Sequence, residues 1–463
     1  MHNRSSGSLA LILVSALTIA ASSGGAALSP SWVIDDVTVI DGTGKPASTH
    51  MRVIVADGVI QSVQPVTTNG TFPEGATRID GRGRFLIPGL WDTHVHLTNV
   101  DEVALPVFPA YGVTSVRDMG GNAAKVMEWR TKVEQGEILG PRIKLCGPML
   151  EGAKWDRDLE DHWVIEDAAQ ARATVNRLAD EGVDCIKMRT FTSPETFFAL
   201  VDTARQRHLP FGGHAPWGVD PIAASNAGQS SFEHAYYPWP WNTIAVDRKR
   251  EIERTFRKNG TLVVPTLVTW EVFRLPASVI ETVIHDTQAR SDPRLRLISP
   301  ELRRNWIYGF ADIKSQNSGS AGWNSALDQL HEQVAEMHDN GVGMMTGTDT
   351  GATLVYPGAA VLQELKLLVA RARFTPMDAL LSATIIPAKY FGLEDRLGTI
   401  EQGKLADMVL LGDDPLLDIA NIHKIDGVML RGVWHDRGML DRTLRDVERR
   451  VAAAYEKGTR ESR

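Results

Sequence analysis

The 463-residue sequence predicts an α/β protein: a (β/α)8 barrel with a small β-sandwich formed by both chain ends. Three observations predict it. Short apolar, strand-like runs alternate with helix-like segments, as in βα units with a parallel sheet. Single polar residues close several of these runs, and such a barrel builds its active site from side chains at the C-terminal ends of its strands. Finally, β-rich stretches flank the whole array.

The two flanking stretches are expected to form the sandwich together. Residues 31–84 alternate in the manner of β-strands, with turn signals at Asp41-Gly42 and Asp57-Gly58. Residues 395–438 show the same β-strand pattern. The tail, residues 439–463, is predicted to be a helix because its apolar residues lie on one side, namely Leu444, Val447 and Val451.

Residues 85–394 are predicted to form the barrel. The helix expected before the fourth strand, from Ile165 to Glu181, carries an apolar stripe at helical spacing. A longer insertion, residues 271–325, is expected to be helical and is placed where it could cover the barrel mouth. The candidate strands begin near Phe85, Val113, Ile143, Val183, Phe211, Ser231, Leu262 and Gly343.

The N-terminus predicts export. Arg4 precedes an apolar run from Leu9 to Ala21, and small residues follow it. This is the pattern of a secretory signal peptide, here residues 1–27. The run is shorter than the roughly 20 residues that a membrane-spanning helix needs. We therefore expect a periplasmic or secreted protein without membrane attachment once the signal is removed.

The composition indicates which classes of binding partner to expect. The net charge is −8 and no long basic run occurs, which argues against nucleic acid and leaves a small-molecule substrate. Self-association into a homo-oligomer stays open. The two cysteines, Cys146 and Cys185, fall on the predicted third and fourth barrel strands, and we expect them to be buried thiols rather than a disulfide.

Six residues, taken together, have the pattern expected of a metal-binding site. His94 and His96 lie two apart at the end of a strand, so their imidazoles share a face. Any one of these residues could instead be structural, and His-Val-His alone is a weak signal. The set as a whole is a stronger signal than any one member. Each later candidate also closes a short apolar run, and apart from one lysine each is of a residue type that binds zinc: Lys187, His214, His234 and Asp349.

These motifs resemble the amidohydrolase superfamily, in the branch related to imidazolonepropionase and the metal-dependent prolidases. The resemblance extends from about residue 32 to about residue 435. It is carried by Pro88–His96, Gly112–Asp118, Ile186-Lys187, Gly213-His214, Glu233-His234, Gly347–Asp349 and Leu397–Asp407.

Lys187 is the unusual member of the set, because a buried ammonium would be repelled by a nearby metal ion. The resemblance implies that CO₂ converts it into N6-carboxylysine, an anionic ligand that bridges two divalent metal ions, zinc being the expected metal. One ion would then be held by His94, His96 and Asp349, and the other by His214 and His234. If Lys187 points outward or forms a salt bridge, the site is mononuclear.

The predicted activity is hydrolysis of a peptide-like amide bond by a metal-bridging hydroxide, with Asp349 as the catalytic proton carrier. A dipeptide or an N-acyl amino acid with a hydrophobic group is the expected substrate. Three alternatives stay open. The same site could hydrolyse a lactone, carbamate or phosphotriester, or a mononuclear form could open a cyclic amide. The protein could also be non-catalytic, like relatives that have lost ligands, although the complete ligand set, Asp349 included, speaks against this.

Substrate contacts are expected from residues that follow the strands. The candidates are Arg117, Trp155, Trp217, Tyr236 and Tyr237, because aromatic walls favour an apolar substrate group. Arg117 has an equal alternative, an ion pair inside the barrel. Arg189 could hold a carboxylate. Glu233 is expected on the opposite face from His234, in a structural role.

Overall fold

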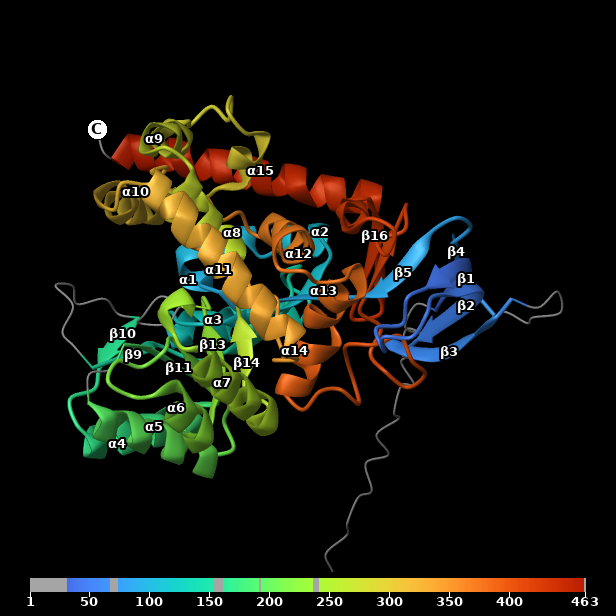
Figure 1. Ribbon diagram of the computed structural model, residues 1–463. Helices are drawn as coiled ribbons and strands as arrows, with labels where there is room; N and C mark the ends of the chain where they lie inside the picture. Colours follow the sequence, from blue (N-terminus) through green and yellow to red (C-terminus); the bar gives the residue numbers. More distant parts are fainter. Residues whose placement is uncertain (1–30, 67–73, 153–160, 191–192, 236–240, 462–463) are drawn as a thin grey trace, which may run out of the picture.

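The computed structural model describes residues 31–66, 74–152, 161–190, 193–235 and 241–461. The expected signal peptide lies outside these residues. Within them, strands from both chain ends form one mixed sheet, and parallel strands with surrounding helices form the larger body (Figure 1). No helix of the described part is both long and apolar enough to cross a membrane.

Strands from both ends of the chain meet, as predicted, and their pairings describe one mixed sheet where a sandwich was expected. Its order is β17-β16-β15-β5-β1-β2-β3, and β4 pairs with β1. The apolar faces of Ile34, Val53 and Met429 meet in its buried cluster. The strands are β1 (Trp32–Val39), β2 (Ser48–Ala56), β3 (Val59–Pro65), β4 (Thr77–Asp80), β5 (Phe85–Pro88), β15 (Met408–Leu411), β16 (Ile425–Leu430) and β17 (Val433–Asp436).

Gly89 divides what the sequence suggested was the first barrel strand. Phe85–Pro88 (β5) pairs with β1 and β15 in the mixed sheet, whereas Leu90–Val95 (β6) pairs with the parallel strands. At Gly89 a Cβ atom would lie 2.2 Å from Thr114 Oγ1, so only glycine allows the chain to pass between the two sheets. The parallel strands therefore begin at Leu90 and not at Phe85.

The parallel strands form two ladders, β6-β7-β8 and β10-β9-β11-β12-β13-β14. The expected eighth strand near Gly343 is reduced to isolated parallel bridges, Met344 with Val263 and Thr350 with Val95. Backbone hydrogen bonds, such as Thr93 N to Thr346 O at 3.0 Å, join this segment to β6. The strands are β7 (Val113–Asp118), β8 (Arg142–Leu145), β9 (Met149–Glu151), β10 (His162–Val164), β11 (Ile186–Thr190), β12 (Phe211–Gly213), β13 (Gln229–Glu233) and β14 (Leu262–Val264).

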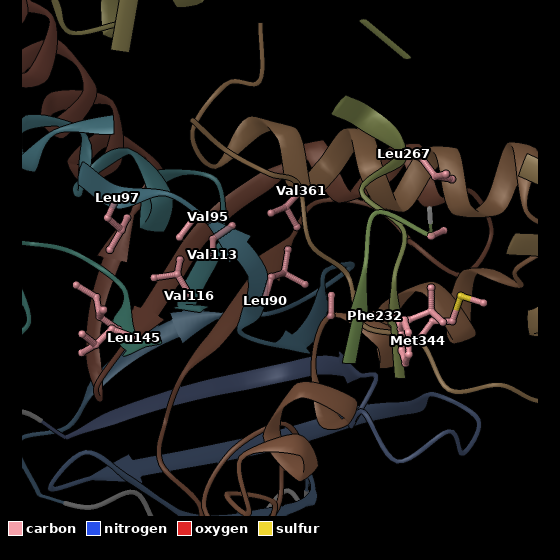
Figure 2. Packing of buried hydrophobic residues seen from close by; sticks show 14 of the residues in the cluster. Leu90, Val95, Leu97, Val113, Val116, Leu145, Phe232, Leu267, Met344 and Val361 are labelled. Carbon is pink, nitrogen blue, oxygen red and sulfur yellow. The ribbon is translucent and has the colours of Figure 1, made fainter. Parts of the chain in front are cut away.

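Helices pack their apolar stripes against these strands, and Figure 2 shows part of the resulting core. Helix α4 (Ala168–Glu181) is typical: Asp167 caps its first turn through Gln170 N, Gly182 ends it in the left-handed conformation, and its buried residues are the stripe read from the sequence. The others are α1 (Leu97–Val100), α2 (Val107–Ala110), α3 (Ala123–Glu134), α5 (Pro194–Gln206), α6 (Pro221–Ala227), α7 (Val246–Asn259), α8 (Leu267–Glu271), α12 (Ala359–Arg371), α13 (Pro376–Ser382), α14 (Ile385–Tyr390) and α15 (Arg437–Glu461).

The insertion after β14 is helical, as expected. It contains α9 (Ala277–His285), α10 (Pro300–Ser315) and α11 (Ala321–Asp339). Residues of α9 and α10 form a separate buried cluster that includes Ile280 and Trp306. Because this cluster fixes α10 independently of the strands, the helix can present a stable face to the site described below.

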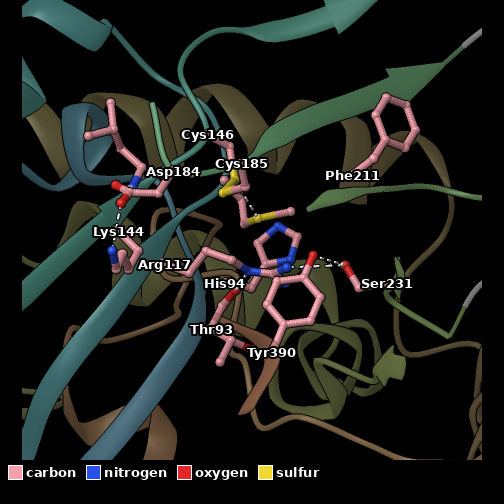
Figure 3. Close-up of a disulfide and its surroundings, with 12 residues drawn as sticks. Thr93, His94, Arg117, Lys144, Cys146, Asp184, Cys185, Phe211, Ser231 and Tyr390 are labelled. Atoms are coloured by element: carbon pink, nitrogen blue, oxygen red, sulfur yellow. Dashed lines mark hydrogen bonds and ion pairs between the residues drawn. A yellow bond between two sulfur atoms is a disulfide. The ribbon is translucent and has the colours of Figure 1, made fainter. Parts of the chain in front are cut away.

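The expectation of two free thiols is wrong. Cys146 and Cys185 form a disulfide, with Cα atoms 4.3 Å apart (Figure 3). They were expected on the third and fourth barrel strands, but neither lies on a strand. Cys146 directly follows β8 and Cys185 directly precedes β11, so the two side chains meet between the strands.

Candidate metal centre

Two imidazoles converge at the end of β6. His94 lies on the strand and His96 just beyond it, with ring centroids 5.3 Å apart. His94 Nδ1 donates to Glu233 Oε2 at 2.8 Å, and His96 Nδ1 donates to the carbonyl of Gly120 at 2.9 Å. These bonds fix both tautomers, so that each Nε2 lone pair is available to a metal ion.

Asp349 completes a group that could hold a metal ion. Its Oδ1 lies 3.5 Å from His94 Nε2 and 3.2 Å from His96 Nε2. The ligand atoms of the three residues lie within 4.8 Å of one another. Asp349 has a φ of 60°, a left-handed conformation that aspartate tolerates better than most residues.

The segment that carries Asp349 is fastened on two sides. Thr348 donates its N–H and its hydroxyl to the Asp92 carboxylate, at 3.0 and 2.6 Å, and Asp349 N donates to His94 O at 2.8 Å. From α10, Asn305 Nδ2 donates to Gly351 O at 2.5 Å. The carboxylate is therefore held against the histidines by bonds from both β6 and the insertion.

The other two predicted histidines lie beside the first pair. His214 follows β12 and His234 follows β13, with ring centroids 4.9 Å apart. The ring of His234 is 4.6 Å from that of His94, and its Nδ1 lies 2.9 Å from Thr266 Oγ1. His214 and His234 line the same cleft as His96.

Lys187 lies among these histidines. It belongs to β11, is 1% exposed, and lines the same cleft. Its Nζ is buried without a hydrogen-bond partner. Burial lowers the pKa of Lys187 to about 8, so that part of the population is a neutral amine near neutral pH. All six residues selected from the sequence are thus brought together.

The protonation states suit a cation. Burial lowers the pKa of His94 and His214 well below the ordinary histidine value, and lowers that of His234 to about 4. Burial would raise the pKa of Asp349, but the hydrogen bond with His96 and neighbouring positive charge outweigh it, and the net shift is downward. His94 Nε2, like Lys187 Nζ, is a buried polar atom without a hydrogen bond. His96 differs: burial would lower its pKa, but its hydrogen bond to Asp349 and the charge of that carboxylate outweigh burial and raise it. Three neutral imidazoles, a carboxylate and two orphaned nitrogens fit a divalent metal ion, which would take the place of the proton between His96 and Asp349.

Arg117 lies beneath the histidines rather than in the cleft. It is fully buried, and Nη2 donates to both oxygens of Glu233 at 2.9 Å (Figure 3 shows Arg117 beside His94). The internal ion pair, one of the two possibilities left open for Arg117, is therefore the one that the structure contains. Glu233 is structural as expected, but it acts directly on a predicted ligand through its bond to His94.

The remaining substrate candidates do not form a wall in the described residues. Trp217 is 56% exposed and does not line the cleft. Trp155, Tyr236 and Tyr237 lie outside the residues that the structure describes. The aromatic wall inferred from the sequence thus has no described member among these four.

The cleft itself has a volume of about 770 Å³, and most of the residues that line it are polar or charged. On one side, Glu151 accepts hydrogen bonds from His162 Nδ1 at 2.7 Å and from Arg189 Nη1 at 2.9 Å. On the other side, α10 contributes residues at helical spacing. This face was not expected from the sequence, although its residues have the spacing of one helix face: Glu301, Arg304, Asn305, Tyr308 and Asp312.

Comparison with known proteins shows which family the chain resembles. The sequence profile of the Amidohydrolase family matches residues 85–435. The chain is 22% identical over 441 residues to an ochratoxinase from Aspergillus niger, covering 82% of this chain and 81% of that protein. It is 23% identical over 382 residues to an imidazolonepropionase from Pseudomonas paraeruginosa, covering 79% and 88%. A solved structure of a Xaa-Pro dipeptidase with bound methionine in the active site superposes with a TM-score of 0.67 at 22% identity, over 88% of this chain and 100% of that one.

The fold combines parallel strands with a His-His-Asp group at their C-terminal ends, which is where such enzymes carry their active sites and which could hold a metal ion. The chain belongs to the amidohydrolase family, and it is a hydrolase that acts on carbon–nitrogen bonds. The resemblance noted from the sequence motifs is thereby confirmed at the level of the family.

Proposed function

We propose that this protein is an exported amidohydrolase with two metal ions, which cleaves a peptide-like amide bond in a dipeptide or an N-acyl amino acid. One observation carries the proposal. The Nζ of Lys187 is buried, has no hydrogen-bond partner, and lines one cleft with His214, His234 and Asp349. Neutralising or derivatising this amine removes the cost of an unpaired buried cation.

We assign the ligands as follows. His94, His96 and Asp349 would hold one ion, and His214 with His234 the other. Lys187, carboxylated on Nζ by CO₂ with release of a proton, would supply an oxygen to both. Zinc suits this set of imidazole and carboxylate-type ligands. When bound, the ions supply Lewis-acid chemistry, which polarises a carbonyl and makes water a better nucleophile near neutral pH.

The residues themselves orient ligands and move a proton. Glu233 and the Gly120 carbonyl hold the tautomers of His94 and His96. Asp349 is ionised and partly accessible from the cleft, with 16% of its side chain exposed. It is therefore placed to take a proton from the attacking water and return it to the nitrogen of the leaving amine.

The polar wall of the cleft supports a substrate with a free carboxylate. Arg189 and His162 lie on that wall, both bonded to Glu151, which fixes their orientation. An amino acid bound in the active site of the similar Xaa-Pro dipeptidase supports the same substrate class. The hydrophobic group inferred from the sequence would have to contact Tyr308 and Met149 or residues beyond the described part.

A matched pair of substrates tests the carboxylate assignment. Arg189→Met is expected to lower kcat/KM for an N-acyl amino acid by about 10- to 100-fold, the usual worth of a hydrogen bond to a charged group. The corresponding N-acyl amino acid amide, which lacks the charge, should be cleaved equally by both proteins. An equal loss on the two substrates would show that Arg189 does not recognise the carboxylate.

Metal content tests the two-ion site. Protein purified without chelators and with bicarbonate should contain about two ions per chain, and Lys187→Ala should contain about one or fewer and lose activity. Lys125→Ala, which removes another lysine that lines the cleft, serves as the control for metal content. About one ion in both wild type and Lys187→Ala would instead favour a mononuclear hydrolase of cyclic amides, the class suggested by the imidazolonepropionase similarity.

We also propose that the parallel strands close into the (β/α)8 barrel and that residues 1–27 direct export. The backbone bonds from residues 343–350 to β6 and β14 support closure. The Cys146–Cys185 disulfide supports export, because such cross-links persist in oxidising compartments. Detection of the protein in a periplasmic or culture-medium fraction, with a mature N-terminus near residue 28, would test the second proposal.

A further inference from the structure

Backbone pairing between β11, the strand that carries Lys187, and the neighbouring chain is interrupted. Below Lys187, Asp184 N donates to Leu145 O at 2.8 Å, and above it the pairing of β11 with β9 starts at Met188 opposite Leu150. Between these points the neighbouring chain runs from β8 to β9 through Gly147 and Pro148. Gly147 has a φ of 77°, and Pro148 has no N–H to donate, so the ladder breaks there.

The Cys146–Cys185 disulfide crosses this break. Cys146 is 1% exposed and Cys185 is fully buried, and both pack on Met119. Cys185 is two residues before Lys187, so the two side chains lie on the same face of the extended chain. The cross-link therefore lies one layer beneath the Lys187 side chain.

Polar side chains reinforce the lower end of the same junction. Asp184 accepts hydrogen bonds from Lys144 Nζ at 2.6 Å and from Arg130 Nη1 at 3.0 Å (Figure 3 shows Lys144, Asp184 and the disulfide). These groups are partly exposed, whereas the disulfide is buried. The disulfide is thus the covalent element of the junction nearest to Lys187.

We propose that Cys146 and Cys185 are positioning residues for Lys187: their disulfide replaces the missing ladder and holds β11 so that Nζ faces the histidines. This inference rests on the proposed role of Lys187 as a ligand. Lysine has a long side chain with several rotatable bonds, so a fixed backbone is needed to keep its terminal atom at one point. Loss of the cross-link loosens β11 at Lys187. It weakens binding of the ion assigned to His214 and His234 more than binding of the ion assigned to His94, His96 and Asp349.

Hydrogen exchange tests the backbone part of the proposal without reference to metal. In Cys146→Ala/Cys185→Ala, amides of residues 183–190 are expected to exchange several-fold faster than in wild type, while those of β13 keep their wild-type rate. Val447→Ala, which removes buried packing in α15, is the control for general loss of stability. It should leave the exchange of residues 183–190 unchanged.

Metal uptake tests the functional part. The same double variant is expected to bind the second ion about ten-fold more weakly, as is usual when groups that orient a ligand are lost. It should also need several-fold more bicarbonate for half-maximal uptake. If the double variant loses thermal stability but keeps wild-type exchange at residues 183–190 and wild-type bicarbonate dependence, the proposal is overturned.

One outcome separates this proposal from the assignment of the metal ligands. Wild type that takes up metal without any dependence on bicarbonate overturns the carbamate, and hydrogen exchange still decides the positioning of β11. If the double variant does not fold, wild type treated with a water-soluble phosphine replaces it. The phosphine takes an oxygen from water to become its oxide, and the disulfide gains two electrons and two protons to become two thiols. Unchanged exchange at residues 183–190 in the reduced protein would overturn the proposal.

Discussion

Replacing Asp349 by asparagine is expected to lower kcat by about 10²- to 10⁴-fold, the usual worth of a positioned proton carrier, with a much smaller change in KM. The substitution keeps the size of the side chain, and asparagine also tolerates the φ of 60° at this position. What it removes is the negative charge and the capacity to accept a proton. Steady-state kinetics on an N-acyl amino acid would measure the loss.

Two measurements keep this result interpretable. Metal content of Asp349→Asn shows how much of the loss comes from weaker binding, because Asp349 Oδ1 also lies beside both His94 and His96. Asp247→Asn makes the same chemical change at a fully exposed carboxylate of α7 and should retain wild-type kinetics. Asp349→Asn with full metal content and activity within ten-fold of wild type would contradict a proton-transfer role.

The set of candidate ligands could be predicted because each member closes a short apolar run. Strand alternation placed His94 and His96 together, and chain order placed the others at neighbouring strand ends. Strand alternation does not predict the orientation of every member of the set. His234 and Asp349 lie past the end of regular pairing, with φ values of 67° and 60°, so period-2 alternation no longer says where their side chains point.

The pairing register between neighbouring strands could not be predicted from the sequence. Arg117 and Glu233 are 116 residues apart, and nothing local to either one selects the other as its partner. The disulfide shows the same limit. Both cysteines were expected on barrel strands, whereas they lie just outside β8 and β11, where the neighbouring chain turns at Gly147 and Pro148.

Glycine positions show why these contacts are possible. A Cβ atom at Gly212 would lie 2.3 Å from Ser231 Oγ and 3.2 Å from Glu233 Oε1. The absence of a side chain there leaves room for the polar groups beneath His94. In the sequence Gly212 is visible only as part of a strand end, whereas in the fold it leaves room for a buried ion pair from other strands.

That ion pair should make Arg117→Met one of the most destabilising single substitutions. Breaking a buried pair typically costs about 3–5 kcal/mol, because the remaining charge is left without compensation. Glu233 would keep its charge with only Ser231 and His94 as partners. Denaturant unfolding of the metal-loaded protein would measure the change. Arg449→Met, at an exposed pair with Asp446 in α15, should cost less than about 1 kcal/mol.

A double-mutant cycle distinguishes a lost ion pair from lost packing. Glu233→Gln alone should weaken metal binding by about 10- to 100-fold, since it removes the carboxylate that orients His94. If the charge on Glu233 causes the instability of Arg117→Met, adding Glu233→Gln should recover part of it, and the double variant should cost less than the sum of the single variants. Strict additivity would mean that the packing of Arg117 against Tyr390, not its charge, stabilises the fold. Metal affinity should stay low in the double variant in either case, because stability depends on the pair whereas the tautomer of His94 depends on Glu233 alone.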